Sequence, residues 1–229
     1  MERPYKIIRR IVYSAALSAL LLWSVSCTVF RAEQKLGSVY FYLGEYFNND
    51  GISSDENRKD GNYDTPENPS GSSYPAEELP PGNAVVPVME CPGLLIMFPP
   101  TQDGMLNNIE CEGQILKGFT PQRFNALYFA GSGTLGDQEG VFKFRFRDGA
   151  VIRQTLVFKD WCSEKDDIED NVIYSCSHRH NYDGKDEQIQ CRLFAVKVDL
   201  NRERYLTSIQ LPENRDIHIF ALTAMVPIE

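Results

Sequence analysis

The stretch "VFKFRFRDGAVIRQTLVF", residues 141–158, decides the fold class because its side chains alternate between apolar and polar. Three phenylalanines alternate with three cations between Phe142 and Arg147, which is the pattern of a strand with one buried face. Asp148-Gly149 follows as a turn signal, and residues 151–158 supply the return strand of a hairpin. The stretch therefore predicts two antiparallel strands that face a core.

Further short runs of apolar or alternating residues lie on both sides of this hairpin, at 94–98, 125–130, 192–200, 205–211 and 217–225. This part of the sequence lacks segments with a helical period and helix caps, and its turn signals recur at spacings typical of a sandwich. We predict an all-β domain over residues 84–229. Its expected architecture is an antiparallel β-sandwich of two sheets with a jelly-roll-like topology.

The N-terminus has the layout of a secretory signal. Basic residues precede Ile11 to Val25, an apolar run shorter than a membrane span usually needs, and the small residues Ser24 and Ser26 suit cleavage. We predict a signal peptide over residues 1–26, with an uncleaved anchor as the alternative, and a secreted or cell-surface protein. Membrane contact is expected only through this N-terminus, if it is uncleaved or carries a lipid at Cys27.

Two segments separate the signal from the predicted sandwich. Residues 27–47 contain a short aromatic stretch that fits a strand or a docking peptide. Residues 48–83 are rich in Asn, Asp, Glu, Ser, Gly and Pro, and their large aliphatic side chains are Ile52 and Leu79. A segment of this composition buries too little apolar surface to offset its ordering entropy, so it predicts a disordered acidic linker.

The chain has six cysteines, which fits disulfide pairing after export. Six thiols allow fifteen pairings that sequence does not rank, and cleavage or acylation at Cys27 would leave an odd number. The five other cysteines are the disulfide candidates: Cys91, Cys111, Cys162, Cys176 and Cys191.

Cysteines, histidines and carboxylates gather in "DWCSEKDDIEDNVIYSCSHRH", residues 160–180. His178 and His180 are two positions apart, so on a strand both face one side and could share a zinc ion with Cys162 and Cys176. The spacing does not match structural zinc motifs, and thiols in an exported chain are usually oxidised. We therefore expect Cys162 and Cys176 to form disulfides, and the two histidines to lie on the surface.

Calcium is the metal that suits this stretch better. Its acidic run offers hard oxygen ligands on a loop, but it lacks the spacing and glycine of an EF-hand, so a solvated acidic loop without an ion is the favoured interpretation and a structural calcium the alternative. The candidate calcium ligands are Asp166, Asp167, Glu169 and Asp170. No other cofactor is expected.

A rim for ligand binding is a second candidate in the same stretch. Aromatic faces stack on sugar rings, and planar polar side chains bind their hydroxyl groups. A tryptophan at the end of a strand is, however, more often a core residue. The candidate ligand-binding residues are Trp161, His178, Arg179, His180 and Tyr182.

Charge and motifs exclude several functions. The net charge of −9 disfavours binding to a phosphate backbone, because no basic stripe offsets it, so a nucleic-acid partner is not expected. The sequence has no Gly-x-Ser-x-Gly elbow, and its carboxylates lie in the predicted linker and loops rather than as a glycosidase pair. We therefore do not expect an enzyme.

Five phrases in the same order resemble a known family: "FPPTQDGMLNNIECEGQIL" (98–116), "FNALYFAGSGTLGDQEGVFKFRFRDGA" (124–150), "DWC" (160–162), "HRHNYDGKD" (178–186) and "LTSIQLPENRDIHIFALT" (206–223). They are similar to the galactose-binding-like β-sandwich domains appended to large secreted glycosidases, including α-mannosidase-like enzymes. The resemblance covers about 130 residues, from Met97 to the C-terminus. It implies an accessory sandwich without the catalytic barrel, a fold that hosts sugar binding, protein binding and spacing alike.

These observations predict a non-catalytic binding or assembly module that recognises a protein or glycan partner at a cell surface or outside the cell. The alternative function is a carbohydrate-binding accessory subunit of a glycosidase complex. A small hydrolase is the remote alternative.

Overall fold

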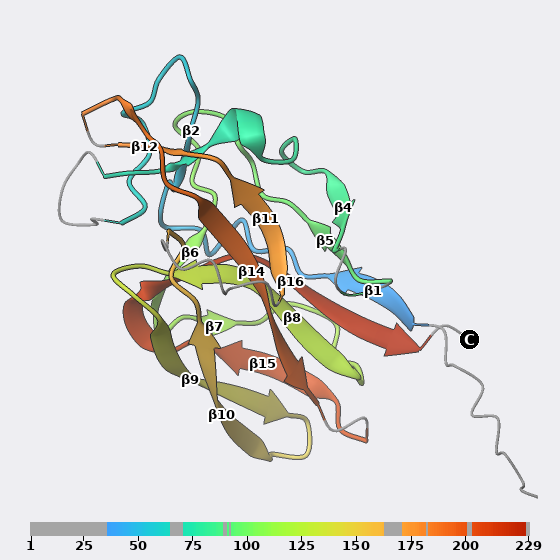
Figure 1. Cartoon of the computed structure of the whole chain (residues 1–229). Coiled ribbons are helices and arrows are strands. Elements are labelled where there is room, and N and C mark those ends of the chain that lie inside the picture. The colour runs from blue at the N-terminus through green and yellow to red at the C-terminus, as the bar shows by residue number, and fades with distance from the viewer. Residues whose placement is uncertain are drawn as a thin grey trace, which may run out of the picture. The chain divides into compact units, whose positions relative to one another are not determined.

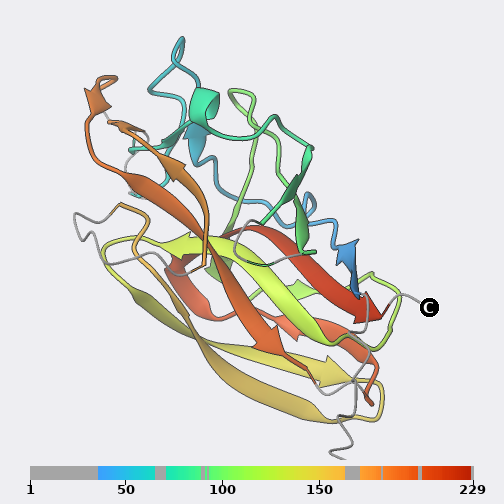
Figure 2. The same cartoon turned by 45° about the vertical axis from the view of Figure 1, so that its right-hand side comes forward.

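The structure, a computed structural model, describes residues 36–64, 71–88, 91, 93–162, 171–181, 183–200 and 203–227. Two main sheets organise this part of the chain (Figures 1 and 2). The larger sheet has the order β1-β16-β8-β14-β11, and β6 also pairs with β16. Its strands are β1 (Leu36–Tyr40), β6 (Ile109–Glu112), β8 (Ala126–Gly133), β11 (Val172–Cys176), β14 (Cys191–Asp199) and β16 (Glu213–Pro227).

The smaller sheet has the order β10-β9-β15-β7. Its strands are β7 (Ile115–Leu116), β9 (Gln138–Phe146), β10 (Val151–Phe158) and β15 (Leu206–Gln210). Three two-stranded pairs complete the described fold, and one short 3₁₀ helix, η1 (Ala76–Glu78), follows β3. These pairs are β2 (Ile52–Ser53) with β3 (Tyr74–Pro75), β4 (Val85–Pro87) with β5 (Leu95–Met97), and β12 (Arg179–His180) with β13 (Asp186–Glu187).

The hairpin predicted from residues 141–158 is confirmed as β9 and β10, which pair over the full length of β10. Gly149 has a φ of 86°, and the amide of Ala150 donates to Oδ1 of Asp148 at 3.0 Å, which together shape the turn. All three phenylalanines of β9 are buried between the two sheets. The predicted all-β sandwich is thereby confirmed.

A second core lies on the outer face of the larger sheet. Tyr63 and Tyr74 are buried there against Phe220 of β16, and Ile52 and Ala130 belong to the same cluster. Figures 1 and 2 show β2, η1 and β4 on the side of the larger sheet opposite to β9 and β10. With both faces covered, seven of the eight residues of β8 are buried rather than alternating.

The structure differs here from the disordered linker expected over residues 48–83. Within this range only residues 65–70 lie outside the described part, and the rest includes β2, β3 and η1. The physical reason is that a few apolar side chains, Ile52, Tyr63 and Tyr74, are buried against an apolar face of the larger sheet. The low apolar content of the segment is therefore compatible with folding, because the sheet supplies the rest of the core.

Two of the five disulfide candidates, Cys162 and Cys191, form a disulfide with each other. Cys176 lies opposite Cys191 in the pairing of β11 with β14, but it is a buried thiol, so its predicted disulfide is wrong. Cys111 is also a buried thiol rather than a disulfide partner, and Cys91 is half-buried. Burial raises the pKa of the Cys176 thiol to about 12, so the group is uncharged at neutral pH.

The predicted signal peptide over residues 1–26, with Cys27 after it, lies outside the described residues. Among the residues that are described, no helix has the length and apolar character needed to cross a membrane.

Candidate functional site

Trp161, the proposed sugar platform, is a core residue just after β10. Its side chain is buried, and its ring centroid lies 4.7 Å from that of Tyr63 and 4.9 Å from that of Tyr74. The Arg179 guanidinium lies 5.5 Å from the centroid of the same ring. The indole face is therefore covered by the protein and does not form an open platform.

Arg179 is engaged by the protein as well. Its guanidinium contacts Oε2 of Glu187 at 2.8 Å and Oδ2 of Asp64 at 3.3 Å. The positive charge of Arg179 is thus already paired with two carboxylates of the protein, and a ligand would have to compete with them. Tyr182 and the predicted calcium ligands Asp166, Asp167, Glu169 and Asp170 lie outside the described residues.

The two predicted histidines meet, but they are not surface residues. His180, in β12, has a fully buried side chain, and His178 is mostly buried, so the expectation of a surface position is wrong. Their ring centroids are 5.4 Å apart. The short β12–β13 pair packs beside β2 and β3, since the backbone of His180 exchanges hydrogen bonds with Ser73. Both rings are therefore held within the folded domain rather than on its surface.

Two aspartates join the histidines. One ligand atom from each of Asp55, His178, His180 and Asp186 can be chosen so that all four atoms lie within 4.8 Å of one another. Asp55 follows β2, and Asp186 begins β13. Arg58 bridges the two carboxylates, with Nη2 at 2.7 Å from Oδ1 of Asp55 and Nε at 2.7 Å from Oδ1 of Asp186.

The electrostatics favour a neutral imidazole at His180 and a charged carboxylate at Asp186. Burial lowers the pKa of His180, and the nearby His178 and Arg58 lower it further. The hydrogen bond from Arg58 lowers the pKa of Asp186. At neutral pH, the His180 ring therefore offers a lone pair and Asp186 offers a negative charge.

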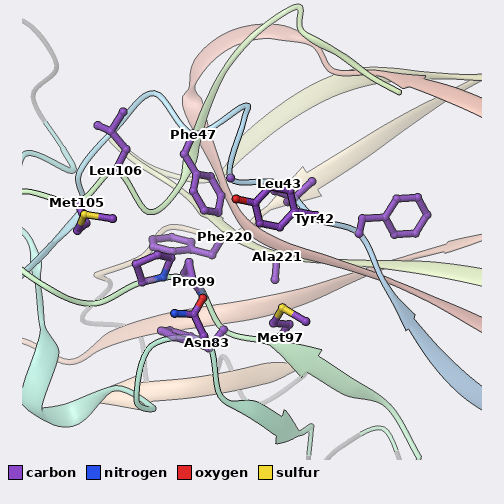
Figure 3. A pocket seen from close by; sticks show the side chains of 14 residues that line it. Tyr42, Leu43, Phe47, Asn83, Met97, Pro99, Met105, Leu106, Phe220 and Ala221 are labelled. Atoms are coloured by element: carbon purple, nitrogen blue, oxygen red, sulfur yellow. The ribbon is translucent and has the colours of Figure 1, made fainter. Parts of the chain in front are cut away.

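An apolar pocket is the second feature with the form of a binding site (Figure 3). It encloses about 170 Å³ beside β16 and is lined by segments at 41–47, 97–100 and 105–106, with Asn83, Phe220 and Ala221. Figure 3 shows Met105 and Leu106 at one end of the pocket and Met97 at the other. A cavity of this volume holds a group of about the size of a benzene ring.

A β-bulge in β16 shapes this pocket. The pairing of β16 with β8 shifts register between Ile219 and Ala221, so Phe220 is the extra residue. As a result Phe220 and Ala221 both belong to the outer core, while Ile219 and Leu222 belong to the core between the sheets. The bulge therefore places two consecutive side chains on the pocket side of the sheet.

The border of the pocket exposes large apolar side chains. Tyr42 is 79% exposed, Leu106 49%, Met105 46% and Met97 37%. Sequence reasoning missed this surface, because its residues come from segments that are distant in sequence and not periodic. The aromatic stretch within residues 27–47, interpreted as a strand or a docking peptide, was the one signal that pointed to it.

The fold places the chain among two-sheet β-sandwich domains. The chain belongs to the AziU2-like β-sandwich domain family, whose model matches residues 38–226. The matched range includes both sheets and also the described part of residues 48–83, which packs on the larger sheet. A search of curated proteins gives no match. These findings confirm a β-sandwich but not the predicted galactose-binding-like accessory domain of a glycosidase.

Proposed function

We propose that the protein is a non-catalytic binding module that docks one apolar side chain of a partner protein in the pocket beside β16. The observation that carries the proposal is the cavity of about 170 Å³ bordered by exposed Tyr42, Met105 and Leu106. Contiguous exposed apolar side chains mark interaction sites, and aromatic residues and methionine are enriched at the centres of interfaces.

A protein partner fits this pocket better than a glycan does. The cavity takes a single aromatic or branched aliphatic group, which a partner protein supplies as a buried anchor residue. Sugar recognition would need planar polar side chains beside an open aromatic face, whereas Trp161 is buried and Arg179 is paired with carboxylates. The net charge of −9 favours a partner with a basic surface around its apolar anchor.

The disulfide supports the proposal that the module works outside the cytoplasm. Bonds of this kind form and persist in oxidising compartments, which agrees with the predicted export signal. The two thiols Cys111 and Cys176 are buried, which protects them from oxidants there. We therefore propose a secreted or cell-surface location.

The Leu106→Asp change is expected to weaken partner binding at least about 30-fold, which corresponds to about 2 kcal/mol for the loss of a hot-spot contact. The partner is first isolated by cross-linking from the source cells, and its affinity is then measured with purified proteins. Leu135→Asp is the matched control, because Leu135 is 78% exposed but does not line the pocket.

Equal affinity of the wild type and Leu106→Asp would contradict the proposal. Selective capture of a glycan by the wild type and by this variant alike would instead support the carbohydrate-binding alternative. Turnover of a hydrolase substrate would contradict the non-catalytic assignment.

A further inference from the structure

We propose that Asp55, His178, His180 and Asp186 form a binding site for a divalent transition-metal ion of the zinc class. The proposal is independent of the apolar pocket, since these residues do not line it. Two imidazole nitrogens and two carboxylate oxygens form a donor set that suits zinc and its first-row neighbours rather than calcium or magnesium, which prefer oxygen alone.

The distances suit a four-coordinate ion. Zinc holds nitrogen and oxygen ligands at about 2.0–2.2 Å, which separates the corners of a tetrahedron by about 3.3–3.6 Å. Nε2 of His180 lies 3.3 Å from Oδ1 of Asp55 and 3.9 Å from Oδ1 of Asp186. All four donor atoms lie within 4.8 Å of one another, so an ion would need side-chain movements of about an ångström.

Two buried imidazole nitrogens without hydrogen-bond partners add to the donor geometry, and in His180 this nitrogen faces the two aspartates. Nε2 of His178 and Nε2 of His180 are buried, and neither has a hydrogen-bond partner among the described residues. A buried polar atom without a partner costs about 1–3 kcal/mol, so such atoms call for an explanation. An ion between the His180 ring and the two carboxylates would satisfy Nε2 of His180, and His178 offers a further ring nitrogen within reach.

The opposite nitrogens are held as metal-binding histidines usually are. Nδ1 of His180 lies 2.8 Å from Oγ of Ser53, which itself lies 2.6 Å from Oγ of Ser73. Nδ1 of His178 lies 3.2 Å from Oε1 of Glu78. Partners of this kind fix the ring orientation and leave Nε2 with its lone pair toward the ion.

Arg58 shows that this position favours a cation. Its guanidinium contacts one oxygen of each aspartate and partly neutralises them. Arg58 contacts the Oδ1 atoms that also face His180, and each carboxylate oxygen has further lone pairs, so the aspartates can bind an ion while Arg58 keeps them in place. The four protein ligands would close the coordination shell, which is typical of a structural rather than a catalytic ion.

The test uses the full chain after removal of metals by a chelator. Isothermal titration with zinc chloride is expected to show one site, and titration with cobalt(II) should give the strong visible absorption of a tetrahedral complex. The Asp55→Asn and Asp186→Asn changes should each weaken zinc binding more than about 100-fold, since loss of an outer-shell partner alone costs 10–100-fold. Both aspartates are partly exposed, so these variants are expected to fold.

Asp183→Asn is the matched control, because Asp183 belongs to the same hairpin but pairs with Lys185 instead. It should bind zinc with wild-type affinity. Zinc should also raise the melting temperature of the wild type and of the control, but not of the two ligand variants. The proposal is overturned if the wild type binds no zinc, if it binds calcium instead, or if both ligand variants retain wild-type affinity.

Discussion

The Tyr63→Ala change is expected to lower the free energy of unfolding by about 3–5 kcal/mol, as is typical when a fully buried aromatic ring is deleted. Tyr63 is completely buried, and its ring centroid lies 4.2 Å from that of His218 and 4.7 Å from that of Trp161. Its hydroxyl lies 2.6 Å from Oγ of Ser132 in β8. The ring therefore connects residues 48–64 to the larger sheet.

Urea denaturation at 25 °C measures this effect. Tyr63→Phe keeps the ring and should cost only about 1 kcal/mol, because Ser132 retains the Tyr74 hydroxyl as a partner at 3.0 Å. Tyr42→Ala is the control on an exposed aromatic residue and should change stability by less than about 0.5 kcal/mol. A loss below about 1 kcal/mol for Tyr63→Ala would show that residues 48–64 do not pack on the sheet.

The second large effect is a loss of stability in acid that depends on His218. This ring is fully buried in β16, and burial lowers its pKa from 6.5 to about 3, with a smaller contribution from Arg215. Below pH 6.5 the unfolded chain therefore binds a proton that the folded chain does not, and stability falls as the pH falls toward 3. At pH 5 the expected loss from this residue is about 2 kcal/mol.

The measurement compares the wild type with His218→Gln at pH 7 and at pH 5. The variant should lose about 2 kcal/mol less than the wild type between these two values. The two proteins are compared because other groups also change the stability in this pH range. His180 has a lowered pKa, so it too lowers the stability as the pH falls. Burial raises the pKa of Asp50 to about 7, so this group raises the stability as the pH falls. Equal losses in both proteins would contradict the assignment.

The strands of the two sheets could be predicted because each carries its pattern locally. The alternation in β9 and the turn at Asp148-Gly149 need no information from elsewhere in the chain. The packing of the described part of residues 48–83 on the larger sheet could not be predicted in this way. Tyr63 and Tyr74 are isolated among polar residues and are buried only by a surface that the sheet supplies. The sequence did carry one signal of a second layer: the apolar run "ALYFA" does not alternate with polar residues. A strand of this kind is buried on both faces, as β8 is.

The candidate metal site was half predictable. The spacing of His178 and His180 correctly placed the two rings near one another. Asp55 lies 123 residues before His178, so no local pattern could join them. The disulfide shows the same limit: the number of cysteines predicted that bonds form, but the partner of Cys191 depends on how the chain returns after β10.

The disulfide between Cys162 and Cys191 also makes the segment between them a covalent ring, with a sequence separation of 29. His178, His180 and Asp186 all lie within this ring, whereas both ends of the ring are fixed at the sandwich. A protease that cut the backbone once anywhere inside it would leave a single covalent molecule, and the two pieces would separate only after reduction. A chain cut once between Cys162 and Cys191 would thus keep the β12–β13 hairpin covalently attached.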